Sequence, residues 1–509
     1  MAADPQTGLI SMAEIARLAG QSRSTVGNWK KRNDDFPKER GSNQRGPLYD
    51  RNEMLDWLRN TGRLTAEDQA DKLVWQAMEA LRGALGVGPA ADLLLVLLGV
   101  KVAAERQSPE VWQEVVREPG TRTLGRAVHD LLPFVSELFV PPAEGADEGL
   151  CRALALLGSV DTGRAGDVAV LDGIVQVMMM IREFGNAAAE YVSPWTLRQL
   201  MVRLAEPRGT VYDPAAGFCQ LLVDAAASST DRVELYAQDV NRRTWEVGTL
   251  NFFLRGIEAD YRLGDTFAAD AFPGLLADIV LTNPPFGLHI PVLEQLQNDP
   301  RWVFGEPGPR DSNAAWIQHC LHHLAPRGSA FVVLPNSALF EGGRGGRVRQ
   351  RVIKAGLLDA VVALPAGLFL TTNIPTALFV FEKDRVNRGG QSSPGPVLMF
   401  DASGLGEKHG RSETYLPEDA LKRVTDTYRA WRARGHVPSD PQAAVVEFEV
   451  IAENNFVVDP RRYVAGTLVT TSETQLLEQR RRVLRSLVDA IGACSAADAA
   501  LLQDFGGEQ

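Results

Sequence analysis

The sequence predicts an α/β domain built on a mostly parallel sheet, with a helix-turn-helix unit and an all-helical domain in front of it. Residues 10–64 read as short helices with a polar, basic loop between them. Residues 66–185 place apolar residues at helical spacing with almost no strand signal. From 191 to about 384, short β-rich runs alternate with helical stretches. Such alternation implies parallel strands joined by helical crossovers, with helices on both faces of the sheet.

Seven short runs rich in β-branched and aromatic residues mark the strands of this sheet. They cover residues 210–212, 233–238, 261–263, 278–282, 330–334, 360–364 and 377–381. The Gly/Ser/Pro-rich stretch that follows looks like a surface loop leaving the sheet, and 471–490 is a predicted helix whose Leu, Arg and Glu pattern suits contact with a partner subunit. The predicted domains are 1–64, 65–185, 186–385, 386–470 and 471–509.

Composition narrows the class of protein. The chain has 509 residues, more than one hydrophobic core usually organises, and its 45% hydrophobic content argues against wholesale disorder. Its four cysteines lie far apart without a C-x-x-C pair, which fits neither a disulfide framework nor a zinc site. We therefore expect a cytoplasmic protein with no bound metal and, since no apolar run is long enough, no membrane span. The net charge of −11 means that any contact with nucleic acid must be local or shared with a basic partner.

The strongest chemical signal is Asn283-Pro284-Pro285-Phe286, directly after the apolar run 277–282. Ligands of α/β sheets bind beyond the carboxyl ends of the strands, where this tetrapeptide lies. An aromatic amine is a poor nucleophile because its lone pair is delocalised into the ring. If the Asn283 side-chain oxygen and the Pro284 carbonyl accept both amine hydrogens, they stabilise the charge that develops on nitrogen, and Phe286 offers a flat face to a base flipped out of a duplex. The alternative is a strand ended by a rigid Pro-Pro turn with Phe286 in the core.

A second group of residues has the spacing of a ligand-binding βαβ unit. Asp213, Ala215 and Gly217 end one predicted strand and open into a helical stretch, where Gly217 lets the backbone approach a ligand closely. Asp239 ends the next strand about 25 residues on, close to the spacing at which a carboxylate reaches ribose hydroxyls. Asp265 ends the third strand and could hold an adenine amine. For each acid the alternative is a helix N-cap.

The front of the chain has the pattern of a DNA-reading helix pair. Ala16 and Val26 would let two helices cross closely, and Gly20 can adopt the left-handed turn between them. The exposed face of the second helix would carry four polar residues available to bases and phosphates, namely Arg23, Thr25, Asn28 and Lys30. The alternative is a helical hairpin used for packing or protein contact.

Together these motifs resemble those of the N6-adenine DNA methylase family, and most closely the modification subunits of type I restriction-modification systems. The resemblance covers about 71–463. Further segments similar in type and order are 334–340, 342–344, 363–369, 373–376, 451–456 and 459–463. Five residues before the sheet look like the family's cofactor segment: Glu190, Tyr191, Val192, Ser193 and Pro194.

The resemblance implies a class I methyltransferase fold, Rossmann-like with a seven-stranded, mostly parallel sheet. It implies S-adenosylmethionine as the cofactor and double-stranded DNA as the substrate, with direct transfer of a methyl group to N6 of a flipped-out adenine. A specificity subunit or other defence-system subunits are expected partners, because no target-recognition domain is evident after the catalytic half. A homodimer is left open.

The sequence departs from the family at two places. Phe218 and Cys219 follow Gly217, where the family usually has a small residue and another Gly, so we expect Phe218 to narrow the cofactor pocket. Family members also usually lack a helix-turn-helix at the front. Two alternatives follow: a methyltransferase that acts on RNA or a protein glutamine, and a DNA-binding regulator whose methylase fold has lost activity.

Overall fold

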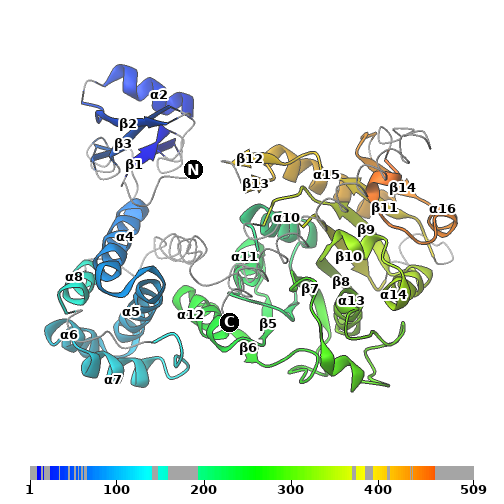
Figure 1. Cartoon of the computed structure of the whole chain (residues 1–509), viewed down its shortest axis with the longest axis horizontal. Helices are drawn as coiled ribbons and strands as arrows, with labels where there is room; N and C mark the ends of the chain where they lie inside the picture. Colours follow the sequence, from blue (N-terminus) through cyan, green and yellow to red (C-terminus); the bar gives the residue numbers. More distant parts are fainter. Residues whose placement is uncertain are drawn as a thin grey trace, which may run out of the picture.

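The computed structural model describes most of the chain between residues 9 and 464 (Figure 1). The described residues are 9–12, 15–16, 23–33, 35–43, 46–50, 53–54, 57–58, 61, 66–139, 147–158, 193–369, 374–384, 394–409, 413–435, 437 and 439–464. They form a small N-terminal unit, a helical domain and a large α/β domain, and the predicted helix at 471–490 lies outside them. No helix in this part of the chain is long and apolar enough to cross a membrane.

The N-terminal unit combines helical turns with a small antiparallel sheet. Its elements are β1 (Leu9–Ser11), α2 (Arg23–Arg32), β2 (Glu39–Asn43) and β3 (Gly46–Asp50), and the sheet order is β1-β3-β2. Ala16 and Val26, the two expected anchors, are buried in a shared core with Phe36, Tyr49 and Trp57. The unit therefore buries an apolar core of its own, while the expected turn at Gly20 lies outside the described residues.

The helical domain follows directly. Its helices are α4 (Ala66–Leu85), α5 (Val87–Gln107), α6 (Pro109–Arg117), α7 (Thr121–Leu131) and α8 (Asp147–Gly158). Helix α5 is apolar on every side, and 90–91, 93–98, 100 and 102–104 are all buried in the domain core. A helix that is apolar on every side must be surrounded by other elements, and α4, α6 and α7 pack on α5 while α8 packs on α4.

The α/β domain is built on a nine-stranded sheet with the order β14-β11-β9-β10-β8-β7-β4-β5-β6. The strands are β4 (Thr210–Asp213), β5 (Glu234–Asp239), β6 (Ala259–Leu263), β7 (Ala277–Thr282), β8 (Leu324–Pro335), β9 (Leu358–Ala363), β10 (Thr376–Glu382), β11 (Val397–Asp401) and β14 (Ala443–Val446). Strands β10 and β14 run antiparallel to their neighbours, and all other pairs in the sheet are parallel.

All seven predicted strands are present, and the expectation of a mostly parallel sheet is confirmed. The two strands that the sequence did not predict, β11 and β14, belong to the segment 386–470. They pair with β9 and with each other, so this segment extends the same sheet.

Helices cover both faces of the sheet (Figure 1). One face packs against α10 (Trp195–Ala205), α11 (Gln220–Ser228) and α15 (Glu418–Arg434), and the other against α13 (Ser312–His322), α14 (Gly343–Lys354) and α16 (Phe448–Glu453). Helix α12 (Arg242–Arg255) joins the sheet to the helical domain, because its Val247, Leu250 and Leu254 belong to the helical-domain core. The short elements are η3 (Pro291–Glu294), η4 (Asn336–Leu339), η6 (Pro460–Arg462) and the hairpin β12 (Glu407–His409) with β13 (Glu413–Tyr415).

Candidate active site

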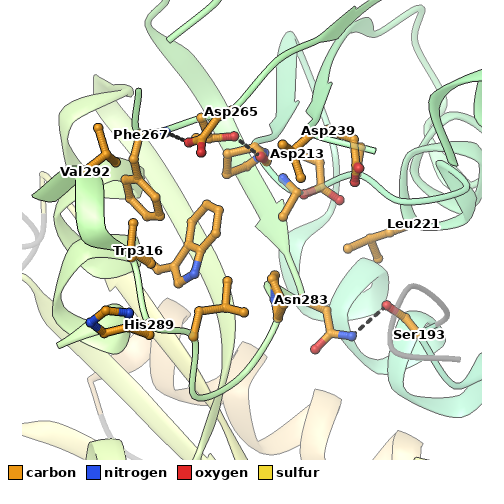
Figure 2. Close-up of a pocket in the computed structure, with 18 of the residues that line it drawn as sticks. Ser193, Asp213, Leu221, Asp239, Asp265, Phe267, Asn283, His289, Val292 and Trp316 are labelled. Atoms are coloured by element: carbon orange, nitrogen blue, oxygen red, sulfur yellow. Dashed lines mark hydrogen bonds between the residues drawn. The ribbon is translucent and has the colours of Figure 1, made fainter. Parts of the chain in front are cut away.

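A pocket of about 240 Å³ opens at the carboxyl ends of β4, β5, β6 and β7 (Figure 2). Parallel strands deliver their carboxyl ends to one edge of the sheet, and ligands of such folds bind there. Figure 2 shows Asp213, Asp239 and Asp265 along one side and Asn283 with Ser193 on another. The lining residues are Ser193, Asp213, Pro214, Ala215, Ala216, Gln220, Leu221, Asp239, Val240, Asp265, Thr266, Phe267, Asn283, Pro285, Leu288, His289, Ile290, Pro291, Val292 and Trp316.

Asn283 is held at the end of β7 with its acceptor oxygen unused. Its Nδ2 donates to Ser193 Oγ at 3.0 Å, whereas its Oδ1 is buried and has no hydrogen-bond partner among the described residues. A buried amide oxygen without a donor costs free energy, so this atom is prepared for a ligand that brings an N–H group. Pro285 also lines the pocket. Phe286 does not, and packs edge-on against Phe369 with ring centroids 5.5 Å apart.

The loop after β4 is folded around Asp213 and Asp239. Gly217 has a φ of 55°, and its N–H donates to Asp239 Oδ2 at 2.9 Å. Asp213 Oδ1 accepts from the Ala215 N–H at 3.0 Å, and Asp239 Oδ1 accepts from the Asn241 N–H at 2.9 Å. Both carboxylates therefore shape the loop, and both also face the pocket.

Burial changes the protonation of these two carboxyl groups. Burial, with a smaller contribution from the nearby Asp239, raises the pKa of Asp213 to about 7, even though the hydrogen bond from the Ala215 N–H lowers it. Burial also raises the pKa of Asp239. Each charged carboxylate is costly here unless a positive charge accompanies it, so this side of the pocket favours a cationic ligand.

The third acid, Asp265, lies beside the apolar wall of the pocket. Its Oδ1 accepts hydrogen bonds from the Phe267 and Ala268 N–H groups at 2.8 and 3.1 Å, as an N-cap residue would. Asp265 also lines the pocket, so the capping role does not exclude contact with a ligand. The Phe267 and Trp316 rings pack with centroids 4.5 Å apart and form the adjoining wall. The sequence did not predict these two aromatic residues, since Phe267 lies in the loop beyond Asp265 and Trp316 lies inside α13.

Phe218 corrects one expectation. It does not line the pocket, and its side chain is buried in the helical-domain core with Val247 and Leu250. The flanking Gly217 and Cys219 have φ values of 55° and 61°, and this double left-handed turn sends the ring away from the pocket. The expectation that Phe218 narrows the pocket is therefore wrong. Cys219 occupies a conformation that favours glycine, which gives a physical reason for the glycine that the family usually has there.

Comparisons with known proteins agree with this geometry. The sequence profile of the N-6 DNA Methylase family matches residues 176–471. The chain belongs to this family.

The activity that goes with an N-6 DNA methylase is adenine-N6 methylation of DNA with S-adenosylmethionine as the methyl donor, so the expectation from the motifs is confirmed. Relatives are named type I restriction enzyme methylase subunits. The HindI subunit of Haemophilus influenzae is 28% identical over 64% of this chain and 74% of its own length. The MjaIX subunit of Methanocaldococcus jannaschii is 28% identical over 55% of this chain, which spans only 52% of that relative.

Solved structures support the fold of this N-6 DNA methylase. The methyltransferase subunit of a type I restriction-modification system from Streptococcus thermophilus superposes with a TM-score of 0.66 at 21% identity, covering 79% of this chain and 100% of that one. A second solved chain, from a structure that describes the assembly and conformational transition of the type I R-M system, superposes with a TM-score of 0.64 at 18% identity. The match covers 85% of this chain and 99% of that one. At these identities the likeness concerns the fold alone.

Half of the catalytic and cofactor-binding residues predicted for this methylase meet in the pocket. Ser193, Asp213, Ala215, Asp239, Asp265, Asn283 and Pro285 line it. Gly217 contributes through its hydrogen bond to Asp239, while Pro194 is the N-cap of α10 and Pro284 is buried and does not line the pocket. Glu190, Tyr191 and Val192 lie outside the described residues.

The predicted DNA-reading helix of the methylase is α2. Asn28 and Lys30 are exposed on it and Thr25 is half-buried, while nothing is described of the Arg23 side chain. Lys30 forms an ion pair with Glu39 on β2, and its ammonium lies 5.6 Å from the Tyr49 ring centroid. An exposed pair of this kind is weak, so Lys30 stays available to a phosphate.

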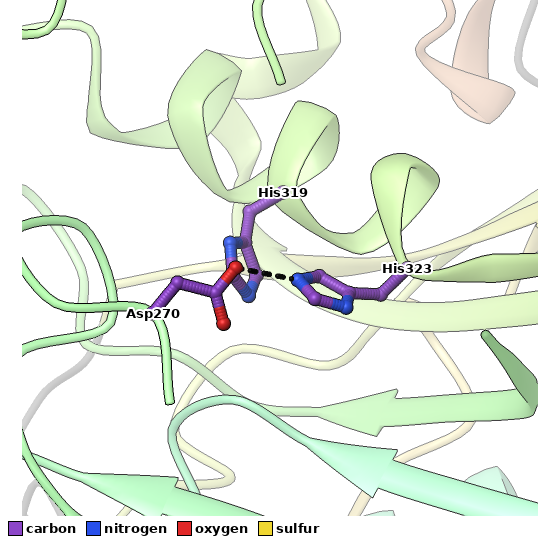
Figure 3. Close-up of side chains that lie close together, drawn as sticks. All are labelled: Asp270, His319 and His323. Carbon is purple, nitrogen blue, oxygen red and sulfur yellow. Dashed lines mark hydrogen bonds and ion pairs between the residues drawn. The ribbon is translucent and has the colours of Figure 1, made fainter. Parts of the chain in front are cut away.

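A cluster of potential metal ligands, Asp270, His319 and His323, lies near the sheet (Figure 3). His323 bonds to Asp270 Oδ2 at 3.0 Å through Nε2 and to the Leu275 carbonyl at 3.1 Å through Nδ1. His319 bonds to the Tyr212 hydroxyl at 3.1 Å, and the Arg301 guanidinium lies 3.3 Å from its other ring nitrogen. Every ring nitrogen is engaged and a cation already sits in the cluster, so we interpret it as a buried polar network that ties α13 to the sheet.

Proposed function

We propose that this chain is the modification subunit of a type I-like restriction-modification system and methylates N6 of an adenine flipped out of double-stranded DNA. The family and the names of its relatives support this assignment. Specificity would come from a separate subunit, and the N-terminal unit, with its exposed Asn28 and Lys30, would add contacts to DNA.

The observation that carries the proposal is the unused Oδ1 of Asn283. It is a buried acceptor at the carboxyl end of a central strand, and its orientation is fixed by the bond from Nδ2 to Ser193. The exocyclic amine of adenine supplies the N–H donor that this atom lacks. Asn283 Oδ1 accepts one amine hydrogen and the Pro284 carbonyl the other, which favours the pyramidal nitrogen and stabilises the positive charge that grows on it.

The residues across the pocket suit S-adenosylmethionine, which supplies an activated methyl group on a positively charged sulfur. Asp239 and Asp265 lie at the ends of β5 and β6, where they can bind ribose hydroxyls and an adenine amine. The buried Asp213 favours a neighbouring positive charge. Phe267 and Trp316 form an apolar wall that suits an aromatic base and excludes water.

The alternative of an inactive methylase fold has lost its main support. It rested on a bulky Phe218 in the cofactor pocket, and that ring packs into the helical domain. The match to the N-6 DNA Methylase family favours DNA over the other alternative, an RNA or protein-amide substrate.

Asn283→Ala tests the assignment. We expect a loss of methyl transfer of ~100-fold or more, as is typical when a preorganised transition-state contact is removed, with nearly unchanged S-adenosylmethionine affinity in calorimetry. Ser193→Ala is the matched control, because it removes the partner that orients Asn283 and leaves the acceptor, so its loss should be smaller. Turnover by Asn283→Ala equal to the wild type would refute the role of this residue.

A further inference from the structure

Helix α14 presents a row of cations in a strongly acidic chain. Its sequence, GRGGRVRQRVIK, contains no acidic residue. Arg344, Arg347, Arg351 and Lys354 are exposed, and their spacing of three, four and three residues places them on one face of the helix. The opposite face is buried through Gly345, Val348, Arg349, Val352 and Ile353. With a net charge of −11 on the whole chain, such a one-sided concentration of positive charge is a distinct surface.

These four cations, the α14 basic face, are not neutralised within the described chain. None of them forms an ion pair with a described carboxylate, whereas exposed arginines elsewhere, such as Arg232 with Glu258, do. Among the described residues, Arg351 donates only to the Phe304 carbonyl at 3.1 Å, and Lys354 lies 5.2 Å from the Phe456 ring centroid. The face therefore keeps most of its positive charge for an external ligand.

The α14 basic face begins at the catalytic edge of the sheet. Strand β8 lies next to β7, with Val332 opposite Thr282, and it ends just before η4 and the start of α14. Arg344 lies beside Gly308, because a Cβ atom built on this glycine would be only 3.2 Å from Arg344 Nη1. The carbonyl of the next residue, Pro309, accepts a hydrogen bond from the N–H of Ile290, which lines the pocket. Arg344 thus adjoins the loop that forms one wall of the pocket.

The helix is also held rigidly. The buried Arg349 donates to the carbonyls of Ala338, Glu341 and Phe456 at 3.2, 2.9 and 2.9 Å. Directly after η4 and before the first turn of α14, Phe340 is 53% exposed. A fixed cationic row preceded by an exposed aromatic ring is suited to an extended, polyanionic partner.

We propose that the α14 basic face binds the phosphate backbone of the DNA strand beside the flipped-out adenine. Arg344 to Lys354 spans about 15 Å along the helix axis. One DNA strand carries a phosphate for every ~3.4 Å of duplex axis, so four cations can face about four phosphates. The inference rests on the proposed function, because it places the DNA that the methylase modifies. The proposal places a DNA contact on the catalytic domain itself. Because the chain as a whole is acidic, such a contact needs a local basic surface.

The test is the salt dependence of DNA association by the full chain carrying Arg344→Gln and Arg347→Gln together. Each phosphate contact contributes a slope of about −0.9 to log K against log salt, so the variant should lose about 2 from the magnitude of the slope. The matched control is Arg208→Gln with Arg232→Gln, which removes the same charge at the amino ends of β4 and β5, the opposite edge of the sheet. It should keep the wild-type slope.

Cofactor affinity and thermal melting point separate binding from folding, and neither should change because both arginines are exposed. An unchanged slope in the α14 variant overturns the inference. If the α14 variant keeps the wild-type salt dependence of DNA binding but no longer assembles with other subunits, the α14 basic face is a protein-docking surface and the inference is also overturned. The proposed function is tested separately, by measuring methyl transfer to adenine. Failure of the wild-type chain in that assay would refute the proposed function.

Discussion

The binding of S-adenosylmethionine should depend on pH through Asp213. This carboxyl group is buried at the wall of the pocket, and burial raises its pKa to about 7. A cationic cofactor stabilises the carboxylate, so binding should release a proton below pH 7. Affinity should then rise as the pH rises through the pKa of Asp213 and level off above it.

The size of the effect follows from that pKa. A group with a pKa of about 7 is ionised in about 3% of molecules at pH 5.5 and about 50% at pH 7, so affinity should rise about fifteenfold between these two values. Staying at or below pH 7 keeps the α-amino group of the cofactor protonated, because such groups titrate near pH 7.7 to 8.0. The free energy of unfolding of the cofactor-free protein should fall as the pH rises from about 4 to 7, because Asp213 keeps its proton in the folded chain and loses it in the unfolded chain.

Isothermal titration calorimetry in buffers of different ionisation enthalpy measures both the affinity and the proton released. Asp213→Asn is the control: it should bind more weakly at pH 7, with an affinity that stays flat down to pH 5.5. A wild-type affinity that changes by less than about twofold over this range would refute the reasoning, because Asp213 would then be ionised without the cofactor or would not sense its charge.

Three further outcomes are expected. Phe218→Ser should destabilise the protein by about 3 kcal/mol or more, as for other large-to-small core changes, while cofactor affinity of the folded fraction stays near wild type; unchanged melting would contradict its place in the core. Asp239→Ala should weaken cofactor binding in calorimetry at least about tenfold, because the acceptor for the Gly217 and Asn241 N–H groups is lost, and wild-type affinity would remove Asp239 from the site. Deletion of residues 1–64 should weaken DNA association and flatten its salt dependence while the methylase stays folded; DNA binding with an unchanged slope would make the N-terminal unit a protein-docking module.

The strands and the acidic side of the pocket were predictable from sequence because both depend on local pattern. β-rich runs separated by helical stretches specify parallel strands, and parallel strands deliver their carboxyl ends to one edge. Asp213, Asp239, Asp265 and Asn283 each follow such a run directly, so their meeting in one pocket follows from topology.

The apolar side of the pocket was not predictable, because it depends on packing between distant segments. Trp316 lies within α13 and reaches the pocket only because that helix packs against β8 and the loop before it. The direction of the Phe218 side chain depends on the left-handed conformations of the two residues that flank it, and a cysteine at 219 does not predict such a conformation. Strand β14 is short and only partly buried, so its alternation signal is weak, and it forms because β11 offers an open edge.

The most direct measurement of the central claim is long-read detection of methylated adenine in DNA from cells that carry this chain, cells that lack it, and cells that carry Asn283→Ala. We predict N6-methyladenine at a defined sequence motif only in the cells with the wild-type chain. Methylated adenine at the same motif in the Asn283→Ala cells, or no methylation in the wild-type cells when the partner subunits are present, would contradict it.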